Sequence, residues 1–135
     1  MYRIVAAVDT SETYGKRIAE TIAGLPGGSG SIEVLVLHCF EENPSGASAT
    51  QIAAVRRCTE RLDEADIDYE VREDSGEPAA AITSLAVEAD ADLIVIGGRK
   101  RTPTGKALFG SVTQEVILEA DRSVMVVGGK ESGRA

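Results

Sequence analysis

The order of apolar segments predicts a single α/β domain over residues 1–135, with a five-stranded parallel sheet and helices on both faces. Five short apolar runs alternate with stretches whose apolar residues recur at helical spacing. This alternation is typical of parallel strands joined by crossover helices. A length of 135 residues fits one domain with one core. Only 4% of the residues are aromatic, so the core has to be built from Ile, Val, Leu and Ala.

The chain opens with a strand and a helix. Arg3–Val8 is an apolar run of strand length. A helix is predicted from Glu12 to Gly24, and Pro26 with the glycines that follow it ends this helix. The apolar residues that share one face of the helix are Tyr14, Ile18, Ile22 and Leu25.

The next three elements differ in the extent of burial that their residue patterns predict. Ile32–Phe40 is hydrophobic along almost all of its length, as expected for a strand covered on both faces. After a polar loop at Glu41–Gly46, apolar residues gather on one side of Ala49–Ala65, which predicts the second helix. Asp68–Glu73 alternates apolar and charged residues, which indicates an edge strand with one face in water.

The last four elements complete the alternation. Pro78 suits the first turn of a helix and opens the third one, and Asp92–Gly97 is the fourth strand. Ser111–Ala120 is the fourth helix; its first residue is the predicted N-cap, and Gln114 stands at capping-box spacing. Ser123–Val127 is the last strand.

The connection between the fourth strand and the fourth helix predicts an anion site. The strand ends in Gly97, and Gly110-Ser111 begin the helix. Free N–H groups and the positive end of a helix dipole suit a phosphate. Asp9, at the end of the first strand, is expected beside Gly97, because ligands of such sheets bind at the carboxyl ends of neighbouring strands. The cations between strand and helix are Arg99, Lys100, Arg101 and Lys106.

Each of these residues also has a purely structural interpretation, and the sequence leaves the choice open. Asp9 and Ser11 are both good N-caps for the first helix, and Ser111 is one for the fourth. Gly97 and Gly98 can form a tight turn after the strand. The cations can be ordinary solvated surface charges.

The histidine and the cysteines are interpreted as packing residues. His38, the one histidine of the chain, stands in a hydrophobic strand and is expected to be packed and hydrogen-bonded rather than catalytic. Cys39 and Cys58 do not form a CxxC pair and are expected to be reduced, buried thiols. No His, Cys and carboxylate cluster has the spacing of a metal site.

Two other nucleotide motifs are absent from the sequence. A P-loop ending at Gly105-Lys106 would need glycine where Lys100 stands and Ser or Thr where Ala107 stands. The glycine-rich turn of dinucleotide-binding folds is missing after the first strand, where Asp9-Thr10-Ser11 stands instead.

Charge and hydropathy restrict the partners and the compartment. The formal net charge is −8, so general binding to nucleic acid or to anionic membranes is not expected. The longest apolar runs are far too short to span a bilayer, and the first residues do not resemble a signal peptide. A cytoplasmic location is expected.

Several segments together resemble the universal stress protein family over nearly the whole chain. They are Val8-Asp9-Thr10-Ser11, Leu37-His38, Gly76-Glu77-Pro78-Ala79, Asp92 to Gly97, Gly110-Ser111-Val112 and Ala120 to Val127. Nucleotide-binding members carry Gly-x2-Gly-x9-Gly-[Ser/Thr] after the fourth strand. Gly97, Gly110 and Ser111 match this motif, and Lys100 stands at the second glycine position. The resemblance implies the adenine-nucleotide alpha-hydrolase-like fold with strand order 3-2-1-4-5.

The resemblance also implies a ligand and the residues that hold it. The ligand is an adenine nucleotide, ATP with or without Mg²⁺. Asp9 would contact the ribose or help to place a metal, Cys39 would border the adenine, and Gly110 with Ser111 would hold the phosphates. The complete predicted set is Val8, Asp9, Thr10, Cys39, Ile96, Gly97, Lys100, Gly110, Ser111 and Val112.

Two functions of different class follow. The first is a cytoplasmic ATP-binding sensor or regulator of the stress response, a homodimer through Val124–Val127 that acts on an unknown protein partner. No general base is identifiable, so the protein is not expected to be an enzyme beyond slow, incidental ATP hydrolysis. The alternative is a protein interaction module of the same fold that has lost ATP binding, because Lys100 replaces the second motif glycine and the basic loop docks an acidic partner.

Overall fold

Four of the five strands, all but the third, consist mainly of apolar residues, and each of the first four is followed by a helix that crosses back over the sheet. The computed structural model describes residues 1–27, 29–43, 45–98 and 109–128. The strands are β1 Tyr2–Ala7, β2 Ile32–Phe40, β3 Asp68–Ser75, β4 Leu93–Gly97 and β5 Ser123–Val127. The helices are α1 Glu12–Ala23, the 3₁₀ turn η1 Ala49–Gln51, α2 Ala53–Glu64, α3 Pro78–Glu88 and α4 Ser111–Glu119.

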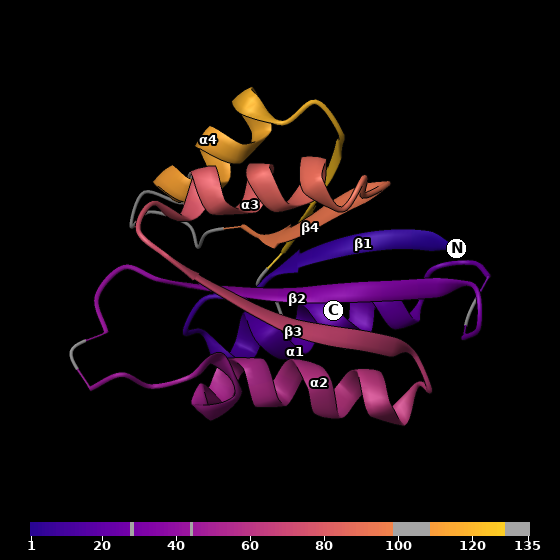
Figure 1. The fold of residues 1–135 in the computed structure, drawn as a ribbon. Helices are drawn as coiled ribbons and strands as arrows, with labels where there is room; N and C mark the ends of the chain where they lie inside the picture. Colours follow the sequence, from indigo (N-terminus) through magenta and orange to yellow (C-terminus); the bar gives the residue numbers. More distant parts are fainter. Residues whose placement is uncertain (28, 44, 99–108, 129–135) are drawn as a thin grey trace, which may run out of the picture.

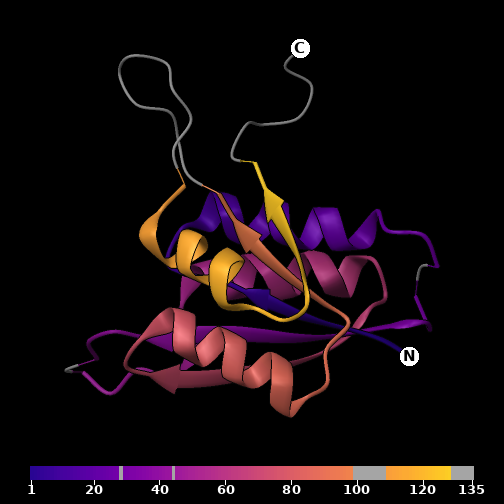
Figure 2. The same cartoon turned by 90° about the horizontal axis from the view of Figure 1, so that it is seen from above.

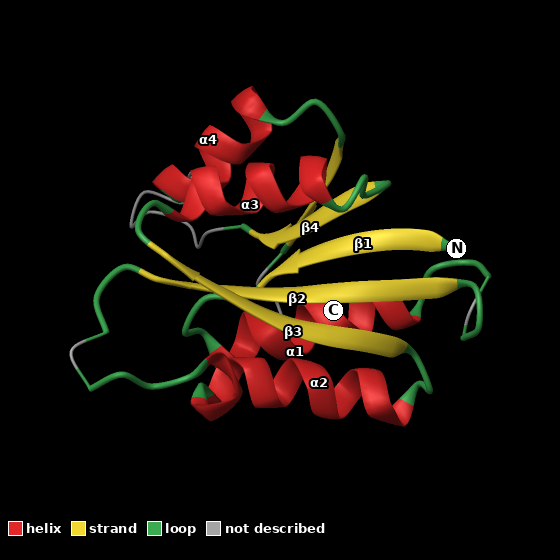
Figure 3. Ribbon diagram, in the orientation of Figure 1, coloured by secondary structure: helices red, strands yellow, loops and turns green. Residues whose placement is uncertain are grey.

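The five strands form one parallel sheet in the order β3-β2-β1-β4-β5, which confirms the predicted fold class and strand order (Figure 3). Strand β1 lies in the centre, between β2 and β4. The order therefore reverses at β1, and the carboxyl ends of β1 and β4 are neighbours, as predicted for Asp9 and Gly97.

The helices form two layers, one on each face of the sheet (Figure 1). Helices α1 and α2 pack below the sheet, where Ile4, Val34 and Val95 are fully or almost fully buried. Helices α3 and α4 pack above it, over Val5 and Ile94. Successive residues of a strand point to opposite faces, which is why nearly continuous apolar strands are needed here.

The prediction of one continuous helix from Ala49 to Ala65 is wrong at its start. Ile52 is extended, with φ −82° and ψ 126°, and separates η1 from α2. Two side chains hold η1 apart from the helix: Glu73 accepts a hydrogen bond from the Ala49 N–H at 2.9 Å, and Gln51 accepts one from Ser48 N–H at 2.7 Å. Apolar periodicity does not detect such a break, because Ala49, Ile52 and Val55 still recur at helical spacing across it.

Candidate functional site

A cavity of about 910 Å³ opens at the carboxyl ends of the central strands and at the first turn of α4. Every predicted site residue that the structure describes lines it. These residues are Val8, Asp9, Thr10, Cys39, Ile96, Gly97, Gly110, Ser111 and Val112. The remaining predicted residue, Lys100, lies outside the described residues, as do Arg99, Arg101 and Lys106.

At the end of β1 the two candidate caps have separate roles. The Ser11 hydroxyl accepts a hydrogen bond from the Tyr14 N–H at 3.2 Å, so Ser11 is the N-cap of α1. Asp9 Oδ1 accepts the Ser11 N–H at 2.9 Å. This turn holds the exposed Asp9 carboxylate at the mouth of the cavity.

At the end of β2, His38 is packed and hydrogen-bonded, as predicted. It is 3% exposed, and its Nδ1 lies 2.8 Å from the Val8 carbonyl oxygen. His38 also lines the cavity, which the sequence did not indicate, because an apolar strand pattern describes the faces of a sheet and not its end.

The two cysteines are free and differ in burial. Cys58 is fully buried in the core below the sheet, and burial raises the pKa of its thiol to about 12. Cys39 is only partly buried, so the prediction of a buried thiol is wrong for it; its position near the end of β2 leaves it at the cavity wall. Burial, followed by the negative charges of Asp74 and Glu41, raises the Cys39 pKa.

Close packing, rather than a tight turn, explains why position 97 is a glycine. Its φ is not in the left-handed region, whereas Gly76 has φ +106°. A Cβ at Gly97 would lie 2.7 Å from Tyr14 Cδ1. Two further contacts fix this end of β4: Thr113 Oγ1 donates to the Gly97 carbonyl oxygen at 2.8 Å, and the Gly98 N–H donates to the Val127 carbonyl oxygen at 2.8 Å. Sequence patterns did not indicate Tyr14 or Thr113 as cavity residues.

The first turn of α4 has no side-chain cap in the described part of the chain. The N-cap is Gly110, with φ −69° and ψ 162°, so the prediction of Ser111 as N-cap is wrong by one position. The expected capping box is also not formed, because the Gln114 amide donates instead to the Phe109 carbonyl oxygen at 3.1 Å. The Ser111 hydroxyl is exposed at the cavity, and no described side chain caps the first amides of α4.

The described wall of the cavity is acidic. It includes the carboxylates of Asp9, Glu41 and Glu42, and neither Lys nor Arg occurs among its described residues. The described residues contain no group of three or more His, Cys, Asp or Glu side chains able to hold a metal ion. No helix described here is long and apolar enough to cross a bilayer.

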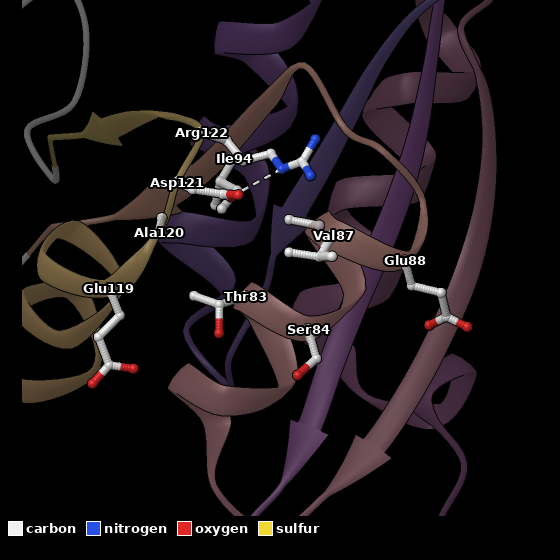
Figure 4. Close-up of a pocket in the computed structure, with 10 residues that line it drawn as sticks. Thr83, Ser84, Val87, Glu88, Ile94, Glu119, Ala120, Asp121 and Arg122 are labelled. Carbon is white, nitrogen blue, oxygen red and sulfur yellow. Dashed lines mark hydrogen bonds and ion pairs between the residues drawn. The ribbon is translucent and has the colours of Figure 1, made fainter.

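A second hollow, of about 520 Å³, lies between α3 and α4 near the amino end of β5 (Figure 4). Arg122 forms one wall and is engaged in structural contacts: its guanidinium donates to Asp90 at 2.9 Å, to the Ala91 carbonyl oxygen at 3.0 Å and to Asp121 at 3.1 Å. Asp90 has φ +51°, so these bonds hold a left-handed turn after α3. None of the predicted site residues lies here.

The chain matches the model of the universal stress protein family over residues 1–128. A universal stress protein of Thermus aquaticus is 31% identical over 134 residues, which cover 92% of this chain and 96% of that protein. One from Mycolicibacterium smegmatis is 39% identical over 67 residues, and this match covers 49% of this chain and 52% of that protein.

Solved structures agree with this match. A universal stress protein of Archaeoglobus fulgidus has a TM-score of 0.74 at 31% identity, over 94% of this chain and 98% of that one. A complex of an A. fulgidus universal stress protein with dAMP has a TM-score of 0.69 at 27% identity, over 94% and 98% of the two chains. A universal stress protein in complex with cAMP has a TM-score of 0.70 at 26% identity, over 95% and 97%.

Proposed function

Because the chain belongs to the universal stress protein family, we propose that it is a cytoplasmic adenine-nucleotide-binding regulator of the stress response. The observation that carries the proposal is the first turn of α4, which no described side chain caps and which faces the same cavity as Asp9. Free amides at a helix N-terminus attract phosphate. Structurally similar universal stress proteins bind dAMP and cAMP, which supports an adenine nucleotide as the ligand.

The strand order supports one orientation for the nucleotide. Phosphates at Gly110 and Ser111 lie at the β4 end, Asp9 follows at the β1 end, and Cys39 lies at the β2 end. Adjacent strands are ~4.8 Å apart, so the distance from β4 to β2 across β1 is roughly 10 Å. That span suits a nucleotide with its phosphates at α4, its ribose at Asp9 and its base beside Cys39.

Nucleotide binding, rather than catalysis, is the proposed activity. ATP, with or without Mg²⁺, would bind in the same orientation, and the positive charges between Arg99 and Lys106, which precede α4 in the sequence, favour its further phosphates. Within the described residues His38 has one side-chain hydrogen bond, to the Val8 carbonyl oxygen, and no nucleophilic side chain is hydrogen-bonded to it. Any ATP hydrolysis is therefore expected to be slow, and the bound nucleotide would act by changing the surface that the protein presents to its partner.

Calorimetry with AMP and ATP, each with and without Mg²⁺, tests the proposal. Asp9→Asn keeps an oxygen for the Ser11 N–H but removes the charge, and Ser111→Ala removes only the exposed hydroxyl. Each is expected to weaken binding roughly 5-fold to 10-fold, as the loss of one hydrogen bond implies. Ser84→Ala, an exposed serine of α3 outside the cavity, is the matched control and should leave the affinity unchanged. Absence of binding by the native chain would reject the proposal.

Lys100 supports a second candidate, an interaction module of the same fold without nucleotide binding. It stands where nucleotide-binding members have glycine. Lys100→Gly separates the two candidates. Nucleotide binding that is kept or improved in this variant, together with loss in Ser111→Ala, supports the first candidate. Absence of heat in the native chain and in both variants supports the second.

We also propose a homodimer. Strand β5 is an edge of the sheet, and Val124, Met125 and Val126 are only partly buried. On the neighbouring helix α4, Ile117 is 40% and Leu118 83% exposed. An unpaired apolar edge favours association, and pairing with its twin across a two-fold axis would cover it.

A further inference from the structure

The imidazole of His38 is held in one orientation at the cavity wall. Its Nδ1 lies 2.8 Å from the Val8 carbonyl oxygen. Its ring meets the ring of Phe40 edge to face, with centroids 4.6 Å apart and planes at 80°. His38 is only 3% exposed, and it still lines the cavity. A ring fixed in this way presents its remaining polar atom in a defined direction.

The Val8 carbonyl decides where the proton of the neutral ring is. A carbonyl oxygen can only accept a hydrogen bond, so Nδ1 has to carry the hydrogen. Nε2 of the neutral imidazole is then an acceptor without a hydrogen. The bond to Val8 is the one hydrogen bond that the imidazole makes to the described residues. Buried acceptors are usually paired, so Nε2, which has no donor among the described residues, indicates a donor supplied by a ligand.

The position of His38 in the sheet identifies the part of the ligand that it meets. His38 and Cys39 are successive residues near the end of β2 and point to opposite faces of the sheet, but both line the cavity at the strand where the proposed nucleotide orientation places the base. The adenine base is therefore the nearest ligand group. Adenine carries one amino group, at position 6, and this group is a hydrogen-bond donor.

We propose that His38 is a specificity-determining residue whose Nε2 accepts a hydrogen bond from the 6-amino group of adenine. The inference rests on the proposed function and adds the atom that selects the base. A purine without this amino group leaves Nε2 buried and unpaired, and a 6-oxo purine places an acceptor against an acceptor. A buried polar group left unpaired implies that binding weakens roughly 5-fold to 100-fold.

The tautomer can be tested directly, because His38 is the one histidine in the chain. In a ¹⁵N spectrum of the histidine-labelled protein, Nδ1 is expected to show a protonated signal and Nε2 an unprotonated one. Addition of AMP should shift the Nε2 signal toward that of a hydrogen-bonded nitrogen. Purine riboside 5′-monophosphate, which has hydrogen in place of the amino group, should leave it unshifted. A proton on Nε2 of the free protein would overturn the inference.

Two variants separate the roles of the two ring nitrogens of His38. The amide of His38→Asn reaches the position of Nδ1, so it can keep the bond to Val8 but offers no acceptor at the Nε2 position. The longer amide of His38→Gln reaches the Nε2 position instead. The native chain is expected to bind AMP roughly 5-fold to 100-fold more tightly than purine riboside 5′-monophosphate. This ratio should fall to near one in His38→Asn and persist in His38→Gln.

The outcomes separate the inference from the function on which it rests. Binding of both nucleotides with equal affinity by the native chain, or an unchanged ratio in a folded His38→Asn, would overturn the inference alone. Absence of binding of either nucleotide would overturn the proposed function together with it. If His38→Asn does not fold, the native ratio and the Nε2 signal decide the question without it.

Discussion

The ring of Tyr14 packs against the backbone of Gly97 so closely that a Cβ at Gly97 would lie 2.7 Å from Tyr14 Cδ1 and 2.9 Å from its Cγ. Helix α1 is thereby joined to the end of β4 at the wall of the cavity. The first glycine of the nucleotide motif thus has a packing reason that does not depend on the ligand. The ribose and phosphates, in the proposed orientation, lie on a surface that this contact shapes.

Gly97→Ala tests the contact. The added methyl group displaces the Tyr14 ring, and we expect the free energy of unfolding to fall by about 1–3 kcal/mol, as for other overpacked sites. Urea unfolding measures the change. In a Tyr14→Ala background the same substitution should be less destabilising, because the group it meets has been removed. Equal losses in the two backgrounds would show that Tyr14 is not the constraint.

Gly15→Ala tests how closely α1 and α2 pack. A Cβ at Gly15 would lie 2.4 Å from the Ala54 carbonyl oxygen, a backbone atom that cannot turn aside. The helices have to separate, so the free energy of unfolding is expected to fall by about 2 kcal/mol or more. Gly24→Ala is the control, because its nearest neighbours are 3.6 and 3.7 Å away and it has φ −87°. Similar effects at the two glycines would contradict the packing argument.

The two helix starts at the cavity should respond differently to loss of a serine hydroxyl. Ser11 caps α1 through the Tyr14 N–H, so Ser11→Ala is expected to lower the free energy of unfolding by about 1 kcal/mol. Ser111 is the first residue of α4 and caps no helix among the described residues, so Ser111→Ala should change the free energy of unfolding by less than about 0.5 kcal/mol. Thermal unfolding without nucleotide measures both. If Ser111→Ala lowers the free energy of unfolding as much as Ser11→Ala does, Ser111 acts as a helix cap after all.

The strands were predictable because burial leaves a direct pattern in the residues. Ile32–Phe40 is apolar along almost all of its length, and both of its faces are covered in the structure. The strand order came from the family resemblance, since hydrophobicity does not say which strand lies beside which. The gathering of Asp9, Gly97 and Gly110 followed from the general rule for parallel sheets.

Other features of the site depend on details that a residue pattern does not carry. The N-cap of α4 shifts from Ser111 to Gly110 because the backbone torsions decide it, and both residue types are acceptable caps. Helical spacing placed Tyr14 on a buried face but could not say that Gly97 lies opposite. The break at Ile52 depends on the Glu73 carboxylate, which arrives from a distant strand.

The two thiols are predicted to react at different rates. Burial raises the pKa of Cys58 to about 12, so almost no thiolate exists near neutral pH, and the sulfur is also inaccessible. Cys39 is partly exposed, although burial and nearby carboxylates raise its pKa as well. A disulfide reagent should label Cys39 slowly, faster as the pH rises, and label Cys58 only on unfolding. AMP should protect Cys39; labelling that AMP does not slow would place the base elsewhere.

The Cys58 thiol also gives stability a pH dependence with a defined sign. The unfolded thiol loses its proton near the ordinary value of 9.0, whereas the folded one keeps it up to about 12. Between these values the folded state binds more protons, so the free energy of unfolding falls as the pH rises. Cys58→Ala should remove this part of the alkaline slope in urea unfolding. An identical slope in the native chain and the variant would contradict the assignment.

The proposed dimer predicts that positive charge on the β5 edge separates the subunits. Val126→Lys and Leu118→Lys each bring an ammonium group into an interface that has to exclude water, so dissociation is expected at concentrations where the native chain is dimeric. Val87→Lys is the matched control, because Val87 is 56% exposed but lies on α3, at the second hollow and outside the proposed β5 and α4 interface. Sedimentation of the three variants measures the effect, with circular dichroism as the check on folding. A native monomer, or a dimer unchanged by Val126→Lys, would reject this interface. Helices α3 and α4 lie side by side, with the second hollow between them (Figure 2). Dissociation by Val87→Lys alone would indicate that the subunits associate through this hollow and not through β5.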